Sequence, residues 1–263
     1  KLFSRRSYAK MFSASLTYVL IVVPISVALG LGSALLISSL RIGNELYKAI
    51  FFLPVMATLL AMAIVWEFAL NPIMGVVNDI LRSGCDKRLI YGFFTGAWYG
   101  ADPLQSWYGT ACADRFPIWL GDKRYALGTI AFIGIWQGFG FNMVLYLAGL
   151  TSVPRELYQA AHMDGADSAW ERFKLVTWPM LGPTHVFVIT ISSIRSFQVF
   201  DTVEALTEGG PSKSTYVMVY AMFEKGVRQN LLGIGSAITI VFLAFVLVLT
   251  LIQVYFVNRR VHY

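Results

Sequence analysis

Long stretches without a charged residue constrain this chain more than any other feature. Met11 to Leu40, Ala126 to Pro154 and Leu231 to Val257 each contain no Asp, Glu, Lys or Arg. A bilayer core needs about 20 apolar residues in a helix to be crossed, so each stretch is long enough to span a membrane. Backbone polar groups in lipid must be satisfied within the segment, and helices do this locally.

Two further stretches are apolar enough to span, although each carries a charge. Ala49 to Leu70 contains Glu67 near its end, and Thr184 to Leu206 contains Arg195 in its middle and Asp201 and Glu204 near its end. With the three uncharged stretches, the sequence predicts an all-α polytopic membrane protein with five spans, in which residues 1–263 form a single transmembrane domain. The composition agrees, because only 14% of the residues are charged, against about 25% in soluble domains.

The net charge of the chain indicates which partners to expect. The formal net charge is +6, which in a membrane protein reflects contacts with loops and lipid headgroups. No stretch resembles an RNA- or DNA-binding module, so we expect membrane lipid and no nucleic acid as a partner.

Asn71 to Tyr125 is polar and aromatic and has no apolar run of span length. We expect residues 71–125 to form a folded insert outside the bilayer. The insert holds the two cysteines of the chain, Cys85 and Cys112, which can form one disulfide or remain two thiols. A disulfide would favour an oxidising compartment on this side, whereas the distribution of Lys and Arg does not decide the orientation.

A charged island at 154–183 lies between two spans. Ser152 is the expected N-cap of its first helix, and Gly165 is expected to end that helix by taking a positive φ. Ser168 and Glu171 have the capping-box spacing that starts a second helix. The pattern predicts a helical hairpin, and an ordinary loop folded back on the bundle is the structural alternative.

Polar residues inside spans are costly in lipid and often functional. The candidates for a substrate pathway are Asn142, Tyr146, Arg195, Ser196 and Gln198. Arg195 has the structural alternatives of reaching to the membrane interface or pairing with Asp201. If Arg195 faces the pathway, its guanidinium favours an anionic solute, such as a sugar sulfonate or glycerol phosphate. A neutral di- or oligosaccharide is the alternative.

The island resembles the EAA loop of permease subunits of bacterial binding-protein-dependent ABC importers. The family pattern is Glu-Ala-Ala, three residues, Gly, nine residues and then I-x-L-P. Here Gln159 stands in place of the Glu, and the distance from Gly165 to Pro179 is one residue longer. The resemblance assigns coupling to the ATPase to the following residues: Gln159, Ala160, Ala161, Met163, Asp164, Gly165 and Ala166.

The segment from Ser196 to Thr215 is similar to the carbohydrate branch of these permeases, which includes maltose and glycerol-phosphate permeases. The resemblance implies a type I importer permease fold in the bacterial inner membrane, with a core of six spans whose first lies upstream of Lys1. The island would be a cytoplasmic coupling hairpin, and the insert would be periplasmic.

The resemblance also implies the partners. They are a second, homologous permease subunit, two copies of an ATPase subunit and a periplasmic solute-binding protein. ATP and Mg²⁺ would bind in the ATPase, and this chain would bind no cofactor of its own. The expected function is translocation of a sugar or sugar-like solute.

The chain lacks recognisable catalytic patterns of its own. Gly209 to Thr215 has the wrong spacing for a phosphate-binding loop, and His162, His185 and His262 are scattered. We therefore expect no enzymatic activity, no catalytic residues and no metal site. The competing functions are a secondary transporter working without an ATPase, which predicts inverted repeats and intramembrane carboxylates, and a membrane scaffold or sensor.

Overall fold

The computed structural model describes residues 6–40, 43–72, 74–78 and 117–258. Four of the described helical segments are long and apolar enough to cross a membrane. They are α1 (Arg6–Ser39), α7 (Ala126–Thr151), α11 (Gly182–Phe197) with its continuation α12 (Asp201–Leu206), and α14 (Leu232–Asn258).

The fifth expected span is present only as a bent pair. Helices α2 (Asn44–Met56) and α3 (Leu59–Ala69) meet at an angle of 97°. Ala57 and Thr58 between them have extended backbone, with ψ near 140°. The break therefore follows Met56, and α2 continues without interruption through Pro54. Counting this pair as one broken span gives the predicted five.

Helices α1 and α7 pack closely because small residues line their contact. Ser26, Gly30 and Ala34 share the buried face of α1. A Cβ added to Gly30 would lie 2.6 Å from the Cβ of Asn142 on α7. A Cβ at Gly134 would collide with the hydroxyl of Tyr18. Small side chains at helical spacing thus bring the two backbones together.

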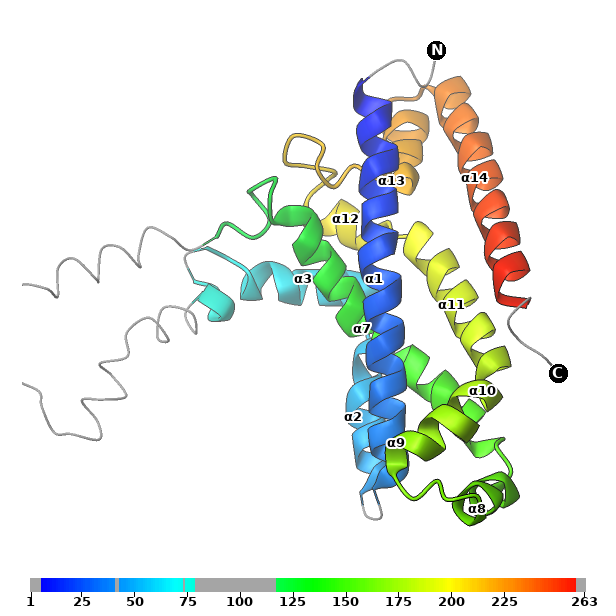
Figure 1. Ribbon diagram of the computed structural model, residues 1–263. Coiled ribbons are helices and arrows are strands. Elements are labelled where there is room, and N and C mark those ends of the chain that lie inside the picture. The colour runs from blue at the N-terminus through cyan, green and yellow to red at the C-terminus, as the bar shows by residue number, and fades with distance from the viewer. Residues whose placement is uncertain (1–5, 41–42, 73, 79–116, 259–263) are drawn as a thin grey trace, which may run out of the picture.

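The two ends of the bundle carry different structures (Figure 1). At one end, near the connection from α1 to α2, lie α8 (Arg155–Met163), α9 (Ala169–Arg172), the π-helical turn η2 (Phe173–Thr177) and α10 (Trp178–Met180). At the other end lie α13 (Met218–Phe223) and the start of α14, and α12 lies below them, level with the end of α11.

Only the base of the predicted insert at 71–125 is described. Trp119 Nε1 donates a hydrogen bond of 2.8 Å to Asn78 Oδ1, which joins the two ends of the insert beside α7. Cys85 and Cys112 lie outside the described residues, so their pairing stays a prediction.

A charged cluster fastens α12 to the π-helical turn η3 (Glu224–Arg228). Arg228 donates to Glu204 at 2.6 Å and to Glu208 at 3.2 Å. These carboxylates favour the charged guanidinium. They raise the pKa of Arg228 above its ordinary value, and the hydrogen bond to Glu208 is the largest cause. The cluster holds α12 against the 207–230 connection.

Candidate functional site

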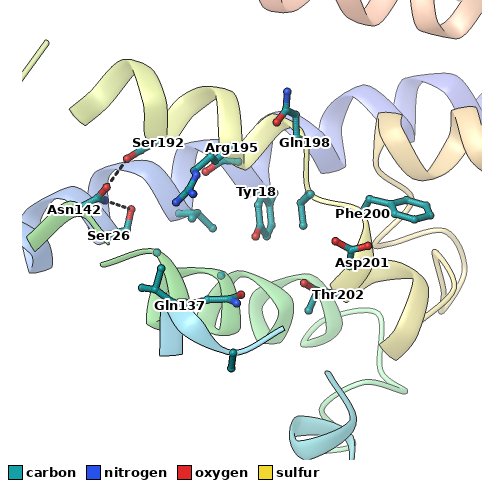
Figure 2. A pocket seen from close by; sticks show the side chains of 17 residues that line it. Tyr18, Ser26, Gln137, Asn142, Ser192, Arg195, Gln198, Phe200, Asp201 and Thr202 are labelled. Atoms are coloured by element: carbon teal, nitrogen blue, oxygen red, sulfur yellow. Dashed lines mark hydrogen bonds between the residues drawn. The ribbon is translucent and has the colours of Figure 1, made fainter. Parts of the chain in front are cut away.

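A cavity of about 520 Å³ lies among α1, α7, α11 and the connection from α11 to α12 (Figure 2). Four of the five predicted pathway residues line it: Asn142, Arg195, Ser196 and Gln198. Sequence reasoning missed several further polar lining residues, which are Tyr18, Ser26, Gln137, Ser192, Asp201 and Thr202. Isolated Ser, Thr and Gln residues in an apolar helix give no sign of which face they occupy.

Tyr146, the fifth predicted residue, lies elsewhere. Its side chain is fully buried in an apolar cluster with Met143 and Leu181. Its hydroxyl lies 2.9 Å from Nδ1 of His185. The structure therefore places Tyr146 between α7 and α11 and away from the cavity that Asn142, one turn earlier on α7, helps to line.

Three helices meet at a hydrogen-bonded chain on the cavity wall. Asn142 Nδ2 donates to Ser26 Oγ at 3.3 Å, and Ser192 Oγ donates to Asn142 Oδ1 at 2.9 Å. All three side chains are at least nine-tenths buried. The amide of Asn142 thus uses both of its functions to join α1, α7 and α11, and in lipid such contacts take the place of water.

Arg195 occupies the last turn of α11 and points into the cavity (Figure 2). Its guanidinium carbon lies 4.0 Å from the ring centroid of Phe141 on α7, a cation–π contact. Within the described part of the chain, no carboxylate lies within ion-pair distance of Arg195. The expected alternative, a pair with Asp201, is therefore not formed.

The break between α11 and α12 sets the position of Asp201. Helix α11 ends with Gln198 as its C-cap, and Phe200 turns the chain with φ −142° and ψ −60°. Asp201 and Thr202 then start α12 and face the cavity. Val55 and Ala57, at the break between α2 and α3, also line it. Two helix breaks thus border the same space.

The hairpin at 154–183 begins with α8, which ends in a Schellman motif. The N–H of Ala166 donates to the carbonyl of Ala161 at 2.9 Å, and the N–H of Gly165 donates to that of His162 at 3.1 Å. Gly165 has φ +89°, the left-handed conformation that this motif requires. Ala161 and Ala166 are both buried in one cluster with Val153 and Val176.

The expected caps of the hairpin are partly confirmed. The Ser168–Glu171 capping box is present, with reciprocal hydrogen bonds of 3.1 Å and 3.0 Å. The expectation for Ser152 is wrong, because its hydroxyl donates to the carbonyl of Gly149 at 2.7 Å and Pro154 is the N-cap of α8. Ser152 keeps helical backbone geometry and extends the end of α7.

The π-helical turn η2 gives a physical account of the longer spacing between Gly165 and Pro179. Hydrogen bonds from i to i+5 hold one more residue in a turn than α-helical bonds do. The turn at Phe173–Thr177 lies between these two positions. Val176 and Thr177 stay buried in it, and Thr177 contacts the hydroxyl of Tyr158 on α8 at 3.0 Å. The extra residue is thus absorbed while the two limbs remain in contact.

The residues assigned to coupling divide into two groups. Ala161 and Ala166 are buried and hold the hairpin together. The others are exposed on its outer side: Gln159, Ala160, Met163, Asp164 and Gly165. Met163 is the most exposed of them, at 86%. An exposed methionine beside small residues makes an adaptable contact surface.

Comparison with known proteins identifies the family. Residues 3–262 match the family described as "Binding-protein-dependent transport system inner membrane component". The chain is 29% identical over 256 residues to the sn-glycerol-3-phosphate transport system permease protein UgpA of Brucella abortus, covering 96% of this chain and 77% of the relative. It is also 29% identical over 241 residues to a probable ABC transporter permease of Pyrococcus horikoshii, covering 92% and 73%.

Solved structures show the same fold. A bacterial ABC transporter involved in the import of the acidic polysaccharide alginate has a chain that superposes with a TM-score of 0.79 at 22% identity. The superposition covers 98% of this chain and 81% of that one. With the cavity, the broken spans and the hairpin, these matches show that the chain belongs to the family of inner-membrane permease components of binding-protein-dependent ABC transport systems.

Proposed function

We propose that this chain is one permease subunit of an ATP-driven importer and that it moves a sugar-like solute with an anionic group through the cavity. The observation that carries the proposal is Arg195, whose guanidinium faces the cavity without an ion-pair partner among the described residues. A planar guanidinium matches the geometry of phosphate and carboxylate. Relatives named for glycerol phosphate and for the acidic polysaccharide alginate support an anionic solute.

The hairpin at 154–183 supplies the coupling in this proposal. Its exposed outer side docks on a partner ATPase subunit, present in two copies, in which ATP and Mg²⁺ bind. A second, homologous permease completes the pathway. A periplasmic binding protein delivers the solute, as supported by the solved complex of the alginate transporter with its "alginate pentasaccharide-bound periplasmic protein". The hairpin side then faces the cytoplasm, and residues 71–125 face the periplasm.

The connectivity gives this coupling a route to the cavity. Helix α7 leads into α8, and α10 leads into α11, so the hairpin joins the two helices that carry Asn142 and Arg195. Both helices contact α1 through the chain of Ser26, Asn142 and Ser192. A displacement of the hairpin therefore moves two cavity walls against the third, which is the rigid-body type of coupling.

Uptake measurements test the role of Arg195. The complex is assembled in proteoliposomes with its partner subunits, and uptake is compared for anionic and neutral sugars. Arg195→Ala is expected to reduce uptake of anionic solutes by about tenfold or more, the value of one charge-assisted hydrogen bond, and to leave neutral solutes unchanged. Equal uptake of anionic solutes by the variant and the parent would refute the proposed pathway.

Co-purification tests the role of the hairpin. Gly165→Arg adds both a strained φ and a large side chain at the docking surface, whereas Gly165→Ala adds the strain alone. No atom lies within 4 Å of a Cβ at Gly165, so the Cβ of either variant meets no other atom of this chain. We expect Gly165→Arg to lose the ATPase from the tagged complex and Gly165→Ala to retain it. Retention of the ATPase and of transport by both would exclude the hairpin as the coupling element.

A further inference from the structure

The cavity holds a second unpaired charge, of opposite sign to Arg195. Asp201 lines the cavity at the start of α12. Within the described part of the chain, no Lys, Arg or His nitrogen lies within 4.0 Å of its carboxylate oxygens. In Figure 2, Arg195 and Asp201 lie on either side of Tyr18. One wall of the cavity is thus cationic and another is anionic.

The neighbours of Asp201 can exchange hydrogen bonds with a solute. Thr202 follows it on α12, is 6% exposed and also lines the cavity. Tyr18 comes from α1, and the absence of a side chain at Gly134 makes room for its hydroxyl. Hydroxyl groups both donate and accept, whereas a carboxylate only accepts. This end of the cavity is therefore suited to groups that donate, and it repels an anionic group.

We propose that Asp201, with Thr202 and Tyr18, binds the hydroxyl groups of the solute, so that the substrate class is anionic polyols. The solute lies with its anionic group at Arg195 and its hydroxyl-bearing end at Asp201. This inference rests on the proposed function and extends it from the charge of the solute to its orientation. A cavity of about 520 Å³ lies within the range of roughly 300 to 1,000 Å³ that is typical of small-molecule sites.

Paired probes that differ only in their hydroxyl groups test this orientation. Equilibrium binding to the purified complex, without the binding protein, is measured for sn-glycerol 3-phosphate and propyl phosphate. Galacturonate and cyclohexanecarboxylate form a second pair. We expect each hydroxylated probe to bind at least about tenfold more tightly than its partner, because hydrogen bonds to a charged group are strong.

The variants separate the two halves of the site. Asp201→Ala is expected to bring each pair to within about threefold, mainly by weakening the hydroxylated probe, and Asp201→Asn, which still accepts a hydrogen bond, to restore part of the difference. Arg195→Ala should weaken both members of a pair and preserve their ratio. If Asp201→Ala leaves the ratio of affinities within each pair unchanged, the hydroxyl subsite is overturned while the role of Arg195 stands.

Two other outcomes are informative. Tighter binding of O-phosphoethanolamine than of sn-glycerol 3-phosphate, lost in Asp201→Ala, would overturn the polyol class in favour of zwitterions. Unchanged affinities for all anionic probes in Arg195→Ala would overturn the anionic proposal itself. Binding of neither hydroxylated probe to the parent complex would refute both proposals together.

Discussion

The guanidinium of Arg195 lies over the ring of Phe141, with 4.0 Å between its central carbon and the ring centroid. The contact joins α11 to α7 and holds the guanidinium beside the cavity. The N–H donors of a guanidinium lie around the edge of its plane, so a contact of its central carbon with the Phe141 ring does not consume them. Phe141 thus holds the charge in place and leaves it available to a solute.

Replacing Phe141 by Leu should weaken binding of an anionic solute. A cation–π contact contributes about 0.5 to 2 kcal/mol, which is roughly 2- to 30-fold in affinity. The measurement is equilibrium binding of sn-glycerol 3-phosphate to the purified complex. Phe139→Leu is the matched control, because Phe139 is on the same helix and packs against Phe51 instead. Equal losses in both variants would show a general packing defect.

A methyl group at Gly30 should destabilise the bundle, and one at Gly32 should not. A Cβ at Gly30 would lie 2.6 Å from the Cβ of Asn142, whereas no atom lies within 4 Å of a Cβ at Gly32. Overpacking of this kind costs about 1 to 3 kcal/mol. The thermal midpoint of the purified complex should therefore fall in Gly30→Ala and be retained in Gly32→Ala. The reverse order would contradict the close packing of α1 and α7.

Neighbouring serines on α11 make a second matched pair. Ser192 donates to Asn142 on another helix at 2.9 Å, whereas Ser193 donates to the carbonyl of Ile189 on its own helix at 2.7 Å. Interhelical hydrogen bonds in membranes contribute about 0.6 kcal/mol on average and up to about 1.7. Ser192→Ala should lower the denaturation midpoint more than Ser193→Ala. Equal effects would exclude a structural role for the hydrogen bonds that join Ser26, Asn142 and Ser192.

The capping box makes the hairpin sensitive to acid. Hydrogen bonds from the backbone and side chain of Ser168 lower the pKa of Glu171 below its ordinary value of 4.5. A depressed folded-state pKa means that the stabilisation is present above the ordinary value and is lost as the pH falls through the lowered pKa. Hydrogen exchange of α9, corrected for intrinsic rates, should therefore accelerate in that window.

Glu171→Gln is the control for this pH dependence. Glutamine can occupy the same capping position but does not titrate. The exchange of α9 in this variant should show no step between neutral and acidic pH. A step of the same size in both proteins would assign the effect to another group.

Deleting one residue from the π-helical turn η2 should leave assembly of the complex intact. Leu175 lies within η2 and is 62% exposed, and its removal would let the turn close with α-helical hydrogen bonds. The burial of Val176 and Thr177 would be kept. Deletion of Leu157 from α8, which has α-helical hydrogen bonds already, should instead rotate all later residues of that helix. Loss of assembly in both deletions would contradict this account of the longer spacing.

The sequence pattern alone predicted those elements whose structure depends on residues close together in the sequence. The uncharged stretch from Met11 to Leu40 needs only its length and composition to predict a span, and α1 covers most of it. The Ser168–Glu171 box and Gly165 also depend on residues a few positions apart. Such contacts recur wherever the local sequence recurs, because their geometry is set by one turn of backbone.

Local sequence pattern could not predict which of Tyr18 and Tyr146 lines the cavity. Both are tyrosines within apolar helices, yet Tyr18 lines the cavity and Tyr146 is buried against His185. Which face of a helix meets a cavity depends on the packing of the other helices. The relation of Arg195 to Asp201 has the same origin, since the break at Phe200 turns Asp201 toward the space that Arg195 faces.

The sequence by itself therefore determined the membrane class, the spans and the hairpin, because hydropathy and turn chemistry act over short distances. Only the tertiary structure decided which polar residues share the cavity and which of them lack partners. Ser26, Asn142 and Ser192 are joined across separations of 116 and 50 residues. No local pattern encodes such a meeting, since it follows from how closely α1, α7 and α11 can approach.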